Sequence, residues 1–175
     1  MADVKAEEIS GVGGLLQRMK AYQDALAQEQ TARAHQEEEQ AKAAQEVATT
    51  FGALVEAATL VAMADGQFSD AESKRLTDRV VPLTGGRLDA TQVGALAQEA
   101  AQRIQGEGAS ARTGAVASTL SDDELRRAAL LVAGAVGWTE GGIGQKEGLA
   151  LQALARAFGI SIEDMHKLLA EAHAG

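Results

Sequence analysis

The amino-acid sequence predicts an all-α protein: a helical bundle with an internal pseudo-two-fold repeat, preceded by a long N-terminal helix. Large apolar residues recur three and four positions apart over most of the 175 residues, which is the spacing of one helix face. Aromatic residues make up only 3% of the chain while alanine is frequent, so the helices are expected to pack through small side chains. Capping motifs mark several helix starts. We therefore expect no strands.

Residues 1–46 are predicted to form an N-terminal helical extension, with a docking helix over 8–26 and a polar spacer over 27–46. The docking helix carries apolar residues that alternate three and four apart, as heptad positions a and d do, and these are expected to contact a protein partner: Val12, Leu15, Met19, Tyr22 and Leu26. The spacer has no apolar side chain larger than alanine, so it is helical by propensity and has nothing to bury. The alternative is a partly frayed extension, because two heptads do not establish a coiled coil.

Residues 47–175 carry the pattern of a compact helical domain. Apolar faces at helical spacing follow one another over 51–62, 76–81, 93–104, 125–136, 149–158 and 162–169. Pro82 and the Gly85-Gly86 pair separate the second face from the third. The segment 106–114 is rich in glycine and small polar residues, so we expect an exposed loop there, followed by a short helical turn to Thr119.

Four motifs predict where helices begin. Ser69…Glu72 and Ser121…Glu124 are capping boxes, in which the serine accepts a hydrogen bond from the amide three residues on and the glutamate reaches back to the cap amide. Asp89…Gln92 and Ser161…Asp164 are weaker versions of the same motif.

An internal repeat relates the two halves of the domain. The segment 61–72 aligns with 136–147, which lies 75 positions later. In both copies an apolar helix end is followed by an acid and a glycine, then by an apolar residue, and then by a glutamate in the next helix: Asp65-Gly66, Phe68 and Glu72 in the first copy, and Glu140-Gly141, Ile143 and Glu147 in the second. Leu76 also matches Leu151, and Leu83 matches Phe158. Beyond a three-residue gap, the third helix of each half aligns as well, with Leu88, Val93 and Leu96 matching Ile160, Met165 and Leu168. We expect Asp65 to lie near Glu140 or to be related to it by the pseudo-two-fold axis.

The first of these motifs, Ala-Met-Ala-Asp-Gly-Gln-Phe-Ser-Asp-Ala-Glu over 62–72, resembles the first signature of the tellurite-resistance TerB family. The segment 131–164 resembles the closing pattern of the same family, although Glu140 replaces the usual aspartate. The resemblance covers about residues 47–172. It implies an all-helical bundle with internal pseudo-symmetry and a role around tellurite resistance, phage or general stress response. It also implies an acidic surface that binds a divalent metal.

Five acids are the candidate metal ligands, for a weakly bound divalent cation such as Ca²⁺ or Mg²⁺: Asp65, Asp70, Glu72, Glu140 and Glu147. The run 65–72 matches positions 5 to 12 of a calcium-binding EF-hand loop, but Val61 and Met63 stand where the first two oxygen ligands would be. A cation would therefore find half of its oxygen shell. The alternative is structural, because helix capping explains Glu72 and a turn explains Asp65.

Catalytic chemistry has no support in the sequence. There is no cysteine, and no nucleophile elbow, phosphate-binding loop or zinc-binding helix motif is present. The three histidines are expected to be solvated, and Trp138 to be either a core residue or part of a partner pocket. We expect no catalytic residues and no cofactor besides the cation. An enzymatic role would require a partner that supplies the missing groups.

The net charge of −9 disfavours nucleic-acid binding and favours cations or basic partners. The first residues are acidic and no apolar run is long enough to span a bilayer, so we expect a cytoplasmic bacterial protein whose membrane association, if any, is peripheral. The leading hypothesis is a non-enzymatic binding or scaffold protein that presents an acidic, metal-binding surface. The alternative is a structural or assembly protein whose N-terminal amphipathic helix mediates oligomerisation or docking to a larger complex or a membrane surface.

Overall fold

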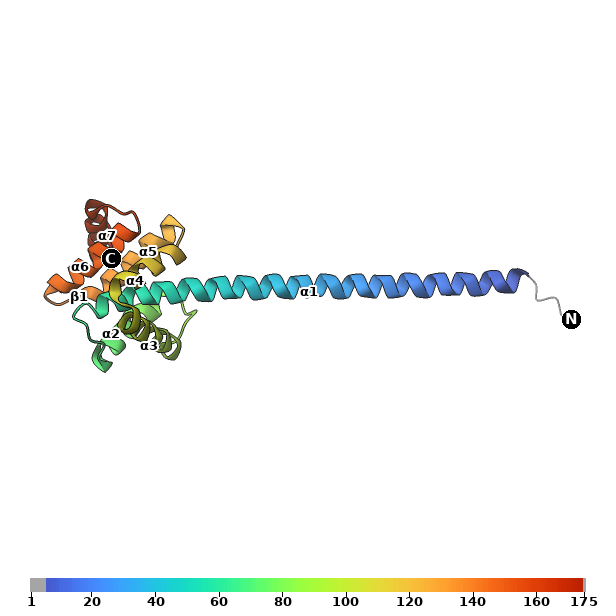
Figure 1. Cartoon of the computed structure of the whole chain (residues 1–175), viewed down its shortest axis with the longest axis horizontal. Coiled ribbons are helices and arrows are strands. Elements are labelled where there is room, and N and C mark those ends of the chain that lie inside the picture. The colour runs from blue at the N-terminus through green and yellow to red at the C-terminus, as the bar shows by residue number, and fades with distance from the viewer. Residues whose placement is uncertain (1–5, 175) are drawn as a thin grey trace. The chain divides into compact units, whose positions relative to one another are not determined.

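The computed structural model describes residues 6–174, with the side chains of residues 6–12 and of Ala172 outside the description. The described elements follow in order along the chain (Figure 1): α1 (Ala6–Ala62), α2 (Asp70–Leu83), α3 (Ala90–Glu107), α4 (Ala109–Thr119), α5 (Asp123–Gly137), β1 (Trp138–Thr139), β2 (Gly142–Ile143), α6 (Gln145–Ala157) and α7 (Ile162–Ala174). The predicted all-α class is confirmed. The one departure is an antiparallel hairpin of two-residue strands, in which Trp138 pairs with Ile143 and Thr139 with Gly142.

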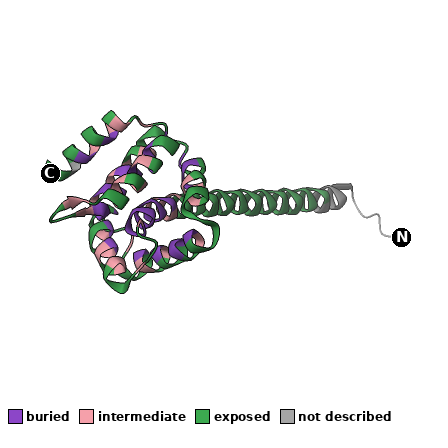
Figure 2. Cartoon of the chain, turned by 60° about the vertical axis from the view of Figure 1, so that its left-hand side comes forward, coloured by how far each residue is buried: buried purple, intermediate pink, exposed green. Residues whose placement is uncertain are grey.

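Contacts within the chain divide it into two units, Met1–Glu46 and Val47–Gly175. In the first unit, helix α1 runs without a break through the predicted docking helix and spacer, and residues 13–46 are all exposed (Figure 2). Exposed pairs one turn apart, such as Arg33 with Glu29 at 2.7 Å, stabilise such a helix by a few tenths of a kcal/mol each. The side chains at the start of the docking helix, residues 8–12 with Val12 among them, lie outside the description.

The second unit has its core around the last turns of α1. Every residue from 55 to 63 is buried, and two apolar clusters share this stretch. The larger cluster joins α1 to α3, α4, α5, α6 and α7, whereas the smaller one joins it mainly to α2 and α3. In Figure 2 the buried residues of these helices lie on the faces that they turn toward one another. Alanines such as Ala57 and Ala58 let the surrounding helices approach closely, as the sequence predicted.

The capping motifs predict three of the four helix starts correctly. Ser69 Oγ accepts from the Glu72 amide at 3.2 Å while Glu72 Oε2 accepts from the Ser69 amide at 2.7 Å. Asp89 and Gln92 form a second complete box at the start of α3, and Ser161 Oγ accepts from the Asp164 amide at 3.0 Å. The prediction for α5 was wrong by one residue. Its N-cap is Asp122 rather than Ser121, since the Asp122 carboxylate accepts from the amides of the two residues Glu124 and Leu125.

The predicted loop over 106–114 was also wrong, because α3 continues to Glu107 and α4 begins at Ala109. The break between them is Gly108 alone, whose φ of 92° suits glycine. Arg112 holds α4 in place: its Nε and Nη2 donate to the buried Glu56 carboxylate at 2.6 and 3.0 Å, and its Nη1 donates to Glu107 at 3.0 Å. These hydrogen bonds raise the pKa of the Arg112 guanidinium.

The far end of α4 is fixed by a second arginine. Arg126 of α5 donates to the carbonyl oxygens of Ala117 and Leu120 at the end of α4, and to that of Phe158 at the end of α6. These are carbonyls that a helix C-terminus leaves without an intrahelical partner. One side chain therefore satisfies the ends of two helices.

The boundaries of the elements follow the predicted repeat. Helix α1 ends at Ala62 and α5 at Gly137, and α2 begins at Asp70 and α6 at Gln145, so both pairs are 75 positions apart. Matched apolar residues are buried alike, namely Leu76 with Leu151, Val93 with Met165, and Ala97 with Leu169. Leu83 and Phe158 differ, since Leu83 is 57% exposed and Phe158 only 2%. Helix α4 lies between the two halves of the repeat.

Among the helices of residues 6–174, none combines the length and the apolar character that crossing a membrane requires.

Candidate binding site

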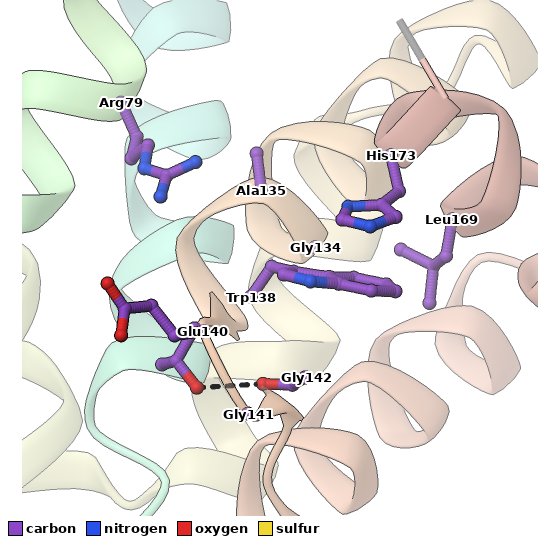
Figure 3. Close-up of a pocket in the computed structure, with 10 residues that line it drawn as sticks. Arg79, Gly134, Ala135, Trp138, Glu140, Gly141, Gly142, Leu169 and His173 are labelled. Carbon is purple, nitrogen blue, oxygen red and sulfur yellow. Dashed lines mark hydrogen bonds between the residues drawn. The ribbon is translucent and has the colours of Figure 1, made fainter.

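A pocket of about 580 Å³ opens beside the hairpin that connects α5 to α6 (Figure 3). Its wall comes from α2, α5, the hairpin and α7. The lining residues are Arg79 of α2, Gly134 and Ala135 of α5, the hairpin residues 138–142, and Leu169 and His173 of α7. Glu140, one of the five predicted ligands, lines this pocket. A concave site with aromatic, apolar and a few charged groups is the usual form of a small-molecule site.

Two aromatic rings form one wall of the pocket. The indole of Trp138 and the imidazole of His173 stack, with their centroids 4.0 Å apart and their planes 18° from parallel. Trp138 is half-buried at the end of α5, so it lies at a pocket wall rather than in the core. His173 is exposed as predicted, but its contact with Trp138 was missed. No local pattern indicates it, because Trp138 of β1 and His173 of α7 are 35 positions apart in the sequence.

Glycines in α5 set how closely the neighbouring helices approach the pocket. A Cβ added at Gly134 would lie 2.2 Å from Leu169 Cδ2, and one added at Gly137 would lie 2.8 Å from Val61 Cγ1. Both positions are filled by neighbouring side chains, so α7 and α1 pack directly on the α5 backbone. Leu169 therefore reaches the pocket wall.

The first acid–glycine turn is closed by its own hydrogen bonds. Asp65 Oδ1 accepts from the Gln67 amide at 3.0 Å, and Gly66 has a φ of 88°. Glu72 is committed to the capping box with Ser69, and Asp70 is exposed as the first residue of α2. One oxygen of Asp65 and one of Glu72 thus already accept backbone N–H groups.

The second acid–glycine turn is a β-hairpin. The Thr139 hydroxyl donates to the carbonyl of Gly142 at 2.9 Å, and the glycine with positive φ is Gly142, at 92°, rather than Gly141. Glu140 is exposed at the hairpin turn. Glu147 lies in the first turn of α6 and its carboxylate folds back to the N-cap, where a Cβ on Gly144 would lie 2.3 Å from its Oε2.

Comparison with known proteins decides the family. A family model described as Tellurite resistance protein TerB matches residues 53–170. The chain belongs to the TerB family. No curated protein and no solved structure matches it. The matched part of this TerB-family protein contains both acid–glycine turns and the pocket wall as far as Leu169, and it confirms the resemblance predicted from the two turns.

The metal that the TerB resemblance implies does not find a complete set of ligands in either turn. The side chains of Val61 and Met63 are buried and carry no oxygen, and Asp65 and Glu72 each use a carboxylate oxygen on a backbone amide. Within residues 13–174, apart from Ala172, no three His, Cys, Asp or Glu residues are grouped so that they could hold a metal ion. The structure thus does not gather the five predicted acids into one cluster, and the metal site stays a prediction.

A second cavity, of about 390 Å³, lies between α1, α4 and α6. Its wall consists of Leu60 and of alanine, serine, threonine and glycine residues, and it has no charged group. These residues can accept an apolar side chain but offer little to orient a ligand.

Proposed function

We propose that this TerB-family protein is a cytoplasmic, non-catalytic binding and scaffold protein of the tellurite-resistance or stress-response type, which docks on a partner protein through one face of α1. The observation that carries the proposal is the exposure of that face. Five large apolar side chains on it are exposed by 39 to 67%, and we call them the docking stripe: Leu15, Leu16, Met19, Tyr22 and Leu26.

The docking stripe has the physical properties of an interface. Full burial of one such side chain stabilises a complex by about 1.5–3 kcal/mol, before the entropic cost of association. All of residues 13–46 are exposed, so no side chain of the docking stripe is buried within this segment. Leu15, Met19, Tyr22 and Leu26 are four, three and four positions apart, and Leu16 adjoins them. This spacing keeps them on one side of the helix, where a partner helix or groove can cover them together.

The domain contributes a negative surface. The whole chain has a net charge of −9, and Asp65, Asp70 and Glu140 are exposed on the two turns. This field favours a basic partner, or weak binding of a divalent cation completed by water. Membership of the TerB family supports a role in binding rather than catalysis.

The second candidate function is assembly, with a second copy of the chain on the docking stripe. The a and d spacing of Leu15, Met19, Tyr22 and Leu26 favours it, because two identical stripes are complementary in a coiled coil. The two candidates share one surface and differ in its occupant.

Sedimentation equilibrium of the full chain separates them. The test variant is Leu15→Glu with Tyr22→Glu, and the control is Gln17→Glu with Gln28→Glu, which adds the same charge off the stripe. Partner docking predicts a monomer at every concentration, and capture of a partner protein that the test variant loses and the control keeps. Assembly predicts a mass that rises with concentration and falls only in the test variant. If neither mass nor capture responds to the test variant, the stripe is no interface.

A further inference from the structure

The charged side chains of the pocket beside the hairpin, which we call the Trp138 pocket, indicate the kind of ligand that it binds. We propose that this pocket binds a small zwitterion with an aromatic or apolar body, of the class of aromatic α-amino acids, with its anionic group at Arg79, its cationic group at Glu140 and its body against Trp138. The site is separate from the docking stripe and does not depend on the proposed function.

The two charged groups of the pocket are opposite in sign and free to pair with a ligand. Arg79 and Glu140 are both exposed, and both line the pocket. Neither makes an ion pair or a side-chain hydrogen bond with any residue in the part of the chain that the structure describes. In Figure 3 the guanidinium of Arg79 and the carboxylate of Glu140 lie on the same side of the Trp138 ring. A ligand between them meets one charge of each sign.

The opposite signs of Arg79 and Glu140 disfavour ligands with a single charge. A cation alone is attracted by Glu140 and by the net charge of −9, but it meets Arg79 in the same wall. An anion alone pairs with Arg79 but meets Glu140. Only a ligand that carries both charges satisfies both side chains at once, which makes the pocket selective against either half of that ligand.

The body of the ligand is set by the rest of the wall. Leu169 and the stacked Trp138–His173 pair form an apolar and aromatic surface, against which a further ring packs edge-on or with an offset. The volume of about 580 Å³ is within the range of small-molecule sites. At Gly141 and Gly142 no side chain narrows the mouth, so the hairpin backbone is open to the ligand.

Trp138 is the only tryptophan in the chain, so its fluorescence reports on this pocket directly. The full-length protein is titrated with three probes that share a phenyl body: L-phenylalanine, 2-phenylethylamine as the cation alone, and 3-phenylpropionate as the anion alone. We expect saturable binding of L-phenylalanine with a Kd of roughly 10⁻⁴ to 10⁻³ M, because a ligand of this size reaches only modest affinity. Each probe with a single charge should bind at least about tenfold more weakly.

Charge-neutral variants assign the two ends. Arg79→Gln should weaken L-phenylalanine about tenfold and leave 2-phenylethylamine unchanged or tighter, whereas Glu140→Gln should weaken L-phenylalanine and spare 3-phenylpropionate. Arg87→Gln and Glu37→Gln change the net charge equally at exposed positions outside the pocket, and should bind like wild type. The shift of the Trp138 indole N–H in ¹H–¹⁵N spectra is the second readout.

The proposal is overturned by no saturable change in either readout at about 10 mM L-phenylalanine, or by equal binding of the three probes. Equal effects of the pocket variants and their controls would also overturn it, because the interaction would then be with the net charge alone. The double variant of the docking stripe should bind L-phenylalanine like wild type. Failure of this site therefore leaves the docking proposal intact, and the reverse also holds.

Discussion

The two acid–glycine turns lie at matched positions of the repeat, where they connect α1 to α2 and α5 to α6, and their hydrogen bonds differ. After α1, Asp65 and the Ser69–Glu72 box satisfy the turn with side-chain oxygens. After α5, a β-hairpin satisfies the backbone, and the N-cap of α6 is Gly144, which has no side chain. The first turn therefore engages Asp65 and Glu72 in local structure, while the second leaves Glu140 exposed at a pocket. The difference in capping follows from the N-cap residue, which is Ser69 in the first turn and Gly144 in the second.

The largest effects should show that the cores of the two halves are equivalent even though their turns are not. Leu76→Ala and Leu151→Ala remove matched, fully buried side chains, and each should lower the free energy of unfolding by about 2–5 kcal/mol. Urea denaturation of both variants measures this. A cost below about 1 kcal/mol in one half only would break the equivalence of the repeat.

Replacement of the matched glutamates Glu72 and Glu147 should lower the stability of the protein by different amounts in the two turns. Glu72→Ala breaks a complete capping box and should lower stability by about 0.5–2 kcal/mol. Glu147→Ala should cost less, because Gly144 supplies no side chain to complete a box. Thermal unfolding of the two variants side by side is the measurement. Equal losses would mean that the difference in capping has no energetic consequence.

The sequence predicted the interactions between residues that are close in the chain, and it did not predict those between residues that are far apart in it. Capping partners are three residues apart, so Ser69 and Asp89 could be placed from the sequence. At α5 the residues Ser121 and Asp122 are adjacent and can both cap a helix, and the structure has Asp122 as the N-cap. The first half of α4, residues 109–114, was predicted as a loop because its small polar residues resemble one. Its anchor, the Arg112–Glu56 pair, joins residues 56 positions apart. The Trp138–His173 stack is likewise tertiary.

A smaller effect comes from giving the second turn the cap of the first. Gly144→Ser recreates the Ser-x-x-Glu pattern at a residue whose φ of −66° any side chain adopts. Glu147 must shift to admit the new Cβ, so we expect a gain of only a few tenths of a kcal/mol. A loss of more than about 1 kcal/mol would show that the Glu147 carboxylate is fixed at its place by other contacts.

The smallest effect is expected from divalent cations. With half an oxygen shell, binding of Ca²⁺ or Mg²⁺ should be no tighter than about 10⁻⁴ to 10⁻³ M, and a concentration equal to Kd stabilises the fold by only about 0.4 kcal/mol. Calorimetric titration of the wild type and of Asp65→Asn measures this binding, and the variant should show no heat of cation binding. Micromolar binding would contradict the structure of the first turn. No heat at millimolar cation would leave Asp65 and Glu72 with their turn and cap alone.

Amide hydrogen exchange of the full chain tests most directly whether the docking stripe is without a partner inside the protein. Residues 13–46 are exposed and residues 55–63 are buried, so at low concentration the first segment should exchange fast and the second slowly. Added partner, or a high concentration if the chain assembles, should slow exchange around Leu15 to Leu26. Protection of residues 13–46 equal to that of 55–63 in dilute protein would contradict the account, because the stripe would then already be covered.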